Sequence, residues 1–163
     1  MKPIVHILLP DIRSAYNVGS IFRSADCFGV EKVILTGTTP QPIDRWGRTN
    51  AGPQKEIAKT ALGGEKSVGW EYIEDVTSFL KKVKKEGFVV IAVEQDKKSI
   101  SLKKFNEELK VEKILLIFGN EVDGVDKRIL KKVDHIVELP MKGEKESLNV
   151  AVCAGVVMYE VCK

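Results

Sequence analysis

Five short apolar runs are spread along the chain, and each has the length of a single β-strand. They cover residues 4–10, 32–36, 88–93, 113–119 and 134–139. Their apolar residues are nearly continuous rather than alternating, which is typical of strands buried on both faces of a sheet. A weaker extended segment covers residues 68–73. Because helical stretches separate these runs, we expect an α/β fold with a mainly parallel sheet and helices on both faces.

The helix between the first two strands has the clearest pattern. Apolar residues recur at helical spacing from Val18 to Phe28, and Gly29 provides a stop. Asn17 stands at the entrance of this helix, and Arg23 lies off its apolar stripe on the same side. The sequence therefore predicts that an Asn and an Arg converge near the end of the first strand.

The segment from Leu148 to Tyr159 contains one Asn and no charged residue. Ser147 and Asn149 are natural N-cap residues, because their side-chain oxygens accept from the free N–H groups of a helix start. The helix that they open is apolar all round, so we expect the sheet to cover one side and another subunit a second side. At about a dozen residues it is too short to span a bilayer.

The remaining helices are shorter, and one long loop separates them from the second strand. We expect helices at residues 54–61, 75–86 and 125–132, the second of them capped by Asp75 and carrying a solvated lysine-rich face. The loop at 37–54 is open to two interpretations, a flexible excursion or a substrate-gripping loop. On the second interpretation its cations, with Trp46 as a stacking ring, are the ingredients of a grip on single-stranded RNA. The candidate RNA-binding residues are Arg13, Arg45, Arg48 and Lys55.

Length and composition narrow the class of protein. The 163 residues fit one domain covering 1–163, and a formal net charge of +3 permits a polyanion partner without requiring one. Three unclustered cysteines in apolar surroundings are typical of buried thiols in a reducing cytosol, and the N-terminal run lacks the pattern of a signal peptide, so we expect a cytoplasmic protein. His6 and His135 lie in strand-like runs without further ligands, so no metal site is expected.

Several familiar catalytic and nucleotide-binding patterns are absent from the sequence. The Gly119–Gly124 loop has no Gly-Lys-Ser/Thr ending, and neither a Gly-x-Gly-x-x-Gly fingerprint nor a Gly-x-Ser-x-Gly elbow occurs anywhere. Three polar segments remain, at 17–23, 119–124 and 139–149. Each follows a predicted strand, so we expect them on one rim of the sheet, where open α/β sheets bind their ligands.

Together these segments resemble the motifs of the TrmH (SpoU) branch of the SPOUT superfamily, which are RNA ribose 2′-O-methyltransferases. The first motif is matched by Asn17-Val-Gly-Ser-Ile-Phe-Arg23, the second by Ile117-Phe-Gly-Asn-Glu-Val-Asp-Gly124 and the third by Leu139-Pro-Met-x-Gly-x-x-x-Ser-Leu-Asn149. Lys59-Thr-Ala-Leu-Gly63 is similar to a segment in the middle of such proteins. The likeness runs in order over nearly the whole chain.

The resemblance implies a fold, a cofactor, a substrate and an assembly. The fold would contain a C-terminal deep trefoil knot, and a homodimer packed through the C-terminal helix would complete the active site. The substrate would be tRNA or rRNA. S-adenosylmethionine would lie in the knotted region, lined by Val93, Glu94, Gly119, Leu139, Met141, Ser147 and Leu148. The implied catalytic residues are Arg23, Asn17, Glu121, Ser147 and Asn149.

Arg23 would bind the adjacent phosphate and stabilise the developing alkoxide, or act as the base when neutral. Other interpretations stay open for single residues. Arg23 also fits a surface salt bridge, Glu121 a charge that complements a helix dipole, and Met141 and Leu148 ordinary packing. For the whole chain the alternatives are a catalytically silent RNA-binding module with the same fold and a nucleotide-binding regulatory domain.

Overall fold

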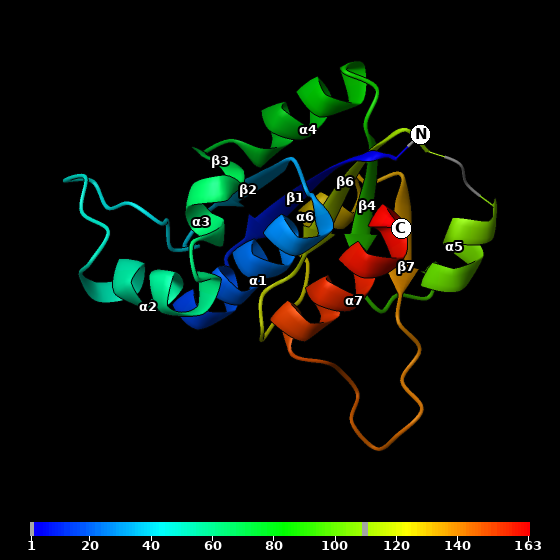
Figure 1. Ribbon diagram of the computed structural model, residues 1–163. Helices are drawn as coiled ribbons and strands as arrows, with labels where there is room; N and C mark the ends of the chain where they lie inside the picture. Colours follow the sequence, from blue (N-terminus) through cyan, green and yellow to red (C-terminus); the bar gives the residue numbers. More distant parts are fainter. Residues whose placement is uncertain (1, 109–110) are drawn as a thin grey trace.

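The computed structural model of the protein describes residues 2–108 and 111–163, which form a seven-stranded sheet flanked by helices (Figure 1). In chain order the elements are β1 (Ile4–Pro10), α1 (Ala15–Phe28), β2 (Lys32–Thr36), α2 (Gly52–Ala61), α3 (Gly64–Ser67), β3 (Gly69–Ile73), α4 (Val76–Lys85), β4 (Val89–Val93), β5 (Ile100–Ser101), α5 (Leu102–Glu108), β6 (Lys113–Phe118), α6 (Lys127–Leu130), β7 (His135–Glu138) and α7 (Val150–Cys162). The spatial order is β3-β2-β1-β6-β4-β7-β5, with all six strand pairs parallel. The expected α/β fold is confirmed, whereas the trefoil knot stays a prediction.

The apolar strands are buried on both faces, as their continuous hydrophobic runs predict. On β1, Ile7 and Leu9 belong to the core shared with α1 and α7, whereas Leu8 belongs to the core shared with α4 and α6. Figure 1 shows α1 and α7 side by side on one side of the sheet and α4 on the other. Because successive strand residues point to opposite faces, a continuous apolar run supplies both cores at once.

Side-chain caps fix where the functional helices begin. The Ser14 hydroxyl accepts from the Asn17 N–H at the start of α1, and Gly29 ends that helix with a φ of 70°. Asp75 caps α4 as expected, and of the two candidates for α7 it is Asn149 that caps the helix. The helix predicted at 125–132 was too long, since α6 covers only Lys127–Leu130.

Small side chains bring α2 and α3 close to α1. A Cβ at Gly19 would lie 2.1 Å from Thr60 Oγ1, and the Thr60 hydroxyl donates to the Tyr16 carbonyl at 2.9 Å. A Cβ at Gly64 would lie 2.8 Å from the Phe22 carbonyl oxygen. Thr60, within the Lys59–Gly63 segment, thus lies at the contact between α2 and α1.

Three short elements and one cysteine differ from the sequence prediction. The helices α3 and α5 and the edge strand β5 were not predicted, because each holds few apolar residues and depends on tertiary contacts. Among residues 102–107 of α5, Leu102 and Phe105 are the buried side chains. Cys27, expected to be buried, is exposed, whereas Cys162 is buried and Cys153 is half-buried.

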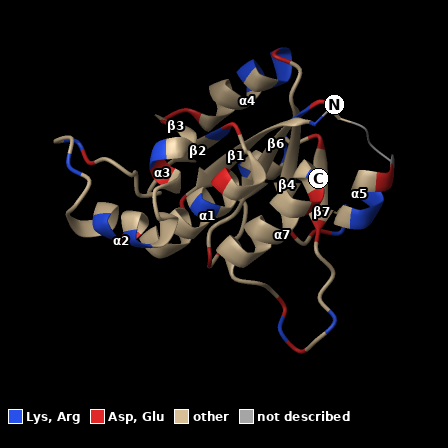
Figure 2. Ribbon diagram, in the orientation of Figure 1, with Lys and Arg blue, Asp and Glu red and all other residues tan. Residues whose placement is uncertain are grey.

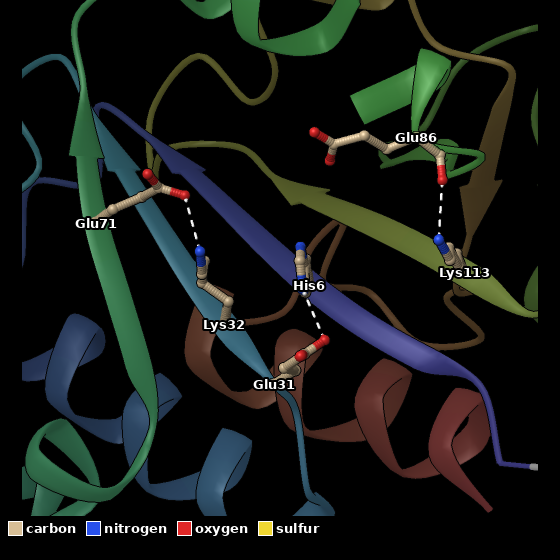
Figure 3. Close-up of polar contacts among 6 residues, drawn as sticks. All are labelled: His6, Glu31, Lys32, Glu71, Glu86 and Lys113. Atoms are coloured by element: carbon tan, nitrogen blue, oxygen red, sulfur yellow. Dashed lines mark hydrogen bonds and ion pairs between the residues drawn. The ribbon is translucent and has the colours of Figure 1, made fainter. Parts of the chain in front are cut away.

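Polar contacts lie toward the amino ends of the strands, on the face of the sheet that α4 covers. Figure 3 shows them as His6 with Glu31, Lys32 with Glu71, and the Lys113 ammonium donating to the Glu86 carbonyl. Burial lowers the pKa of His6, although its hydrogen bond to Glu31 opposes that shift. These contacts lie toward the amino ends of the strands, opposite to the carboxyl ends where the candidate site lies.

Candidate functional site

A cavity of about 500 Å³ opens at the carboxyl ends of β4 and β6. Its lining residues come from β4, from β6 and the loop after it, and from the segment that enters α7: Val93, Glu94, Phe118, Gly119, Asn120, Glu121, Val122, Asp123, Gly124, Ser147, Leu148, Asn149 and Val150. Its volume lies within the usual range for small-molecule sites. The second and third sequence motifs therefore do meet at one rim of the sheet.

The loop at 119–124 folds into a tight hairpin that forms one wall of the cavity. Asn120 and Gly124 exchange backbone hydrogen bonds, and the Asn120 side-chain oxygen accepts from the Val122 and Asp123 N–H groups. No side chain fits at Gly119, because a Cβ there would lie 2.1 Å from the Gly124 carbonyl carbon. Gly119 is therefore required by the close approach of the loop to itself, whereas Gly124 has a φ of 68° and a Cβ there would lie 2.1 Å from Glu94 Oε2.

Glu94, the first residue after β4, anchors this hairpin to the end of the strand through hydrogen bonds. One carboxylate oxygen accepts from the Val125 N–H at 2.9 Å, and the other accepts from the Gln95 N–H at 2.8 Å. Glu94 thus fixes the position of the hairpin relative to the sheet while it lines the cavity.

A chain of hydrogen bonds joins the three sequence motifs. The Asn17 side-chain amide donates to Glu121 Oε1 at 2.9 Å, and the Asn149 amide donates to Asn17 Oδ1 at 3.2 Å. These pairs are 104 and 132 positions apart in the sequence. Asn149 Oδ1 also accepts from the first N–H groups of α7. Because Glu121 only accepts when ionised, it orients the Asn17 amide, which in turn orients Asn149.

Glu121 lies at the N-terminus of α1. Its carboxylate accepts from the Arg13 N–H at 3.0 Å and from the Ser14 N–H at 3.2 Å, in addition to Asn17. Partial burial opposes ionisation, but these hydrogen bonds outweigh it and lower the pKa of Glu121. Glu121 thus complements a helix dipole, that of α1, while it closes the hydrogen-bond chain.

The structure separates the expected cofactor-binding residues into two groups. Val93, Glu94, Gly119, Ser147 and Leu148 line the cavity. Leu139 and Met141 are half-buried outside its lining, and Leu139 packs against the core.

The charge of the lining narrows the chemistry of the ligand. It contains the carboxylates of Glu94, Glu121 and Asp123, and no Lys or Arg. A phosphate would meet only repulsion from these side chains, whereas a cationic ligand with an apolar part would find both carboxylates and apolar walls. The carboxylates and apolar residues of the lining therefore fit the sulfonium and adenosine of S-adenosylmethionine better than a nucleotide phosphate.

Arg23 lies outside this cavity. It is exposed on α1, and at about 1.5 Å per residue it is about 9 Å farther along the helix than Asn17. Within the described part of the chain its guanidinium makes no hydrogen bond or ion pair. The surface salt bridge considered as an alternative is therefore not formed, and the expected convergence of Arg23 with Asn17 at one cavity is not seen in a single copy of the chain.

The candidate RNA-binding residues lie mostly away from the cavity, on a projecting loop and on α2. Figure 2 shows basic residues along both segments. The guanidiniums of Arg45 and Arg48 lie 4.0 and 4.6 Å from the centroid of the Trp46 ring, and Arg48 also pairs with Asp44 at 2.7 Å. The Trp46 ring therefore carries two stacked cations, which gives the loop a local structure that the sequence did not predict.

The other two candidates are more isolated. Lys55 is exposed on α2, and Arg13 is exposed beside a second cavity of about 380 Å³ with Asp11 and Asp123. These acids lower the positive potential around Arg13, so this second cavity is a poor phosphate site.

Sequence reasoning missed Asn120 and Ser14, which shape the two loops of the site. Their signals were available, since Asn120 directly follows a strand-ending glycine and Ser14 directly precedes an apolar-periodic helix. Gln95 was missed as well, and its exposed position in an irregular loop gives it no sequence signal.

The described ranges 2–108 and 111–163 contain neither a metal-binding cluster nor a helix suited to span a membrane. No cluster of His, Cys, Asp and Glu there has the arrangement of a metal site. No helix in those ranges combines the length and the apolar character needed to cross a membrane.

Comparison with known proteins gives consistent matches over the whole fold. The model of the SpoU rRNA Methylase family matches residues 4–159. An uncharacterized tRNA/rRNA methyltransferase of Borreliella burgdorferi is 28% identical over 155 residues, which are 95% of this chain and 62% of that protein. The 23S rRNA (guanosine-2′-O-)-methyltransferase RlmB of Neisseria meningitidis is 29% identical over 159 residues, 98% of this chain and 58% of that protein.

A solved structure matches in fold. The AdoMet-bound rRNA methyltransferase from Sinorhizobium meliloti superposes with a TM-score of 0.83 at 21% identity, covering 99% of this chain and 56% of that one. The chain thus spans about three fifths of the length of these three proteins.

Proposed function

Since the chain belongs to the SpoU rRNA Methylase family, we propose that it methylates a ribose 2′-hydroxyl of tRNA or rRNA with S-adenosylmethionine as donor. The observation that carries this proposal is the cavity at the carboxyl ends of β4 and β6, with its three carboxylates and no cation. That charge pattern also argues against the nucleotide-binding regulatory domain, because such a domain needs a positive group or a free helix N-terminus for phosphate.

Residues on both walls of the cavity would hold the cofactor. Val93 and Leu148 supply apolar surface for the base, the backbone around Gly119 supplies hydrogen-bonding groups, and Glu94 supplies negative charge near the sulfonium. Leu139 and Met141 stay predicted cofactor contacts on the grounds of the motif alone. When bound, the cofactor supplies an electrophilic methyl group.

The chain's own groups position the substrate and stabilise charge. Asn17, Glu121 and Asn149 form one oriented chain, and Ser147 stands in the lining beside Asn149. Methyl transfer would leave S-adenosylhomocysteine and release the 2′-hydroxyl proton to solvent water, so a positive group near the developing alkoxide would lower the barrier. We assign this role to Arg23, whose charged guanidinium would stabilise the alkoxide and bind the adjacent phosphate.

A second copy of the chain would bring Arg23 to the cavity, which has no cation of its own. The α7 face that supports this homodimer is apolar and uncovered. Val152, Val156 and Tyr159 follow one another at helical spacing on α7 and are 54%, 41% and 57% exposed, and Leu148, just before the helix, is 42% exposed. A stripe of this kind on a helix fits burial against an identical helix.

RNA would be held mainly by Arg45, Arg48 and Lys55, with a smaller contribution from Arg13 because acidic side chains lie beside it. Their contribution is measurable from the salt dependence of RNA binding. A plot of the logarithm of the RNA association constant against the logarithm of the salt concentration has a negative slope. Replacing both Arg45 and Arg48 by Ala should make this slope less steep by about 1 to 2. A matched control is Lys81→Ala on α4, an exposed lysine on the other side of the sheet, which should leave the slope unchanged.

The direct test combines calorimetry with mapping of modified positions. We expect S-adenosylmethionine to bind the purified protein and, with total tRNA or rRNA added, labelled methyl groups to appear on specific ribose 2′-oxygens. Binding of RNA without binding of the cofactor would instead identify a catalytically silent module. Binding of a free nucleotide but no RNA would identify a regulatory domain.

A further inference from the structure

The segment between β7 and α7 carries one wall of the cavity but has little structure of its own. Residues 140–147 form no hydrogen bond between backbone groups in the described chain, and all of them except Met141 are exposed. Figure 1 shows this segment projecting from the body of the molecule before it enters α7. Since Ser147 and Leu148 line the cavity, the position of this segment decides whether that wall is in place.

One side chain outside the segment holds it. The Gln95 amide donates to the Glu146 backbone carbonyl at 2.6 Å, the only hydrogen bond from elsewhere in the described chain that reaches residues 140–147. The acceptor is a main-chain oxygen, so it is available whatever side chain stands at 146. The next hydrogen bond along the chain that joins this segment to another element is the one that the Asn149 side-chain amide donates to Asn17 Oδ1, at the start of α7.

Gln95 also stands in a particular place. It follows Glu94, which fixes the opposite wall through the Val125 N–H. The end of β4 therefore holds both walls, one through Glu94 and the other through Gln95. The Gln95 backbone N–H that donates to Glu94 would remain in any variant, so changing the Gln95 side chain releases only the second wall.

We propose that Gln95 is a positioning residue for the cofactor, acting through the Glu146 carbonyl to hold the 139–149 segment against the cavity. This inference rests on the proposed function for the identity of the ligand. The Gln95 side chain itself is not part of the cavity lining.

The first arm of the test measures cofactor binding. Gln95→Ala and the isosteric Gln95→Glu, which cannot donate when ionised, should each raise the Kd for S-adenosylmethionine about fivefold, which corresponds to about 1 kcal/mol. The KM for the cofactor should rise in step while kcat at saturating cofactor stays within about twofold. Lys97→Ala is the control, because Lys97 is an exposed neighbour on the same turn without a hydrogen bond or ion pair among the described residues.

The second arm is independent of the cofactor. Trypsin should cut the Lys142–Gly143 bond of the folded, cofactor-free protein about fivefold faster in both Gln95 variants than in wild type or Lys97→Ala. Equal cleavage rates in all four proteins would overturn the inference. If the wild type binds no S-adenosylmethionine, the proposed function fails, and the cleavage rates still decide whether Gln95 holds the segment.

Discussion

Replacing Glu121 by Gln tests the hydrogen-bond chain that joins the three motifs. The Glu121 carboxylate accepts from the Arg13 and Ser14 N–H groups and from the Asn17 amide. A Gln side chain keeps one acceptor oxygen and turns an NH₂ group toward these donors, so at least one of them loses its partner. A hydrogen bond to a charged group contributes about 1.5–3 kcal/mol, and because Glu121 is partly solvated we expect a loss of about 1–2 kcal/mol in unfolding free energy.

The loss should appear in both equilibrium and thermal unfolding. For a chain of this length, 1–2 kcal/mol corresponds to a fall in Tm of about 3–6 °C. Urea unfolding followed by circular dichroism at pH 7, at one fixed protein concentration, gives the free energy directly. Glu74→Gln serves as the control, since Glu74 is exposed and forms no hydrogen bond or ion pair with the described residues.

The pH dependence of the unfolding free energy shows whether Glu121 stabilises the protein through its ionised carboxylate or through packing alone. The pKa of Glu121 is lowered in the folded protein, so its contribution is present at neutral pH and is lost as the pH falls below the ordinary value of 4.5. The stability gap between wild type and Glu121→Gln should therefore narrow between pH 7 and pH 3. A variant as stable as wild type at pH 7, or a gap that stays constant down to pH 3, would refute the reasoning.

Three other substitutions test the remaining parts of the site. Arg23→Ala should abolish methyl transfer while cofactor affinity, measured by calorimetry, stays within a few-fold; near-normal turnover would contradict its role. Gly119→Ala should destabilise the protein by about 2 kcal/mol or more in urea unfolding because its Cβ would meet the hairpin backbone, whereas Gly143→Ala, with open space around its Cβ, should be neutral. Val152→Glu should convert a dimer into monomers in light scattering and remove activity, whereas Leu62→Glu, at an exposed apolar position just after α2, should do neither. A Val152→Glu protein that stays dimeric would exclude α7 as the interface.

The strands and long helices could be predicted because their signals, apolar runs and helix caps, lie within the elements themselves or directly beside them. A run such as residues 113–119 is too apolar to lie anywhere but between two layers, and Asp75 and Asn149 mark helix starts by chemistry that acts over a few residues. The rim that gathers the second and third motifs followed from the same pattern, because carboxyl ends of parallel strands share one edge.

Short elements could not be predicted in this way. The helix α5 is held by the burial of Leu102 and Phe105, and the strand β5 by pairing with β7 at two positions. Such elements are stable only in the presence of their neighbours, so their own sequences carry little signal.

By itself, the sequence determined the α/β class, the positions of the main elements and the residue types available at one edge of the sheet, because hydrophobic periodicity and helix caps are properties of neighbouring residues. Tertiary structure alone decided the strand order, the pairing of Glu121 with the start of α1, the exposure of Arg23 away from the cavity, and the contact of Gln95 with the Glu146 carbonyl. These features join residues far apart in the chain, and their geometry depends on how whole layers pack rather than on any local preference.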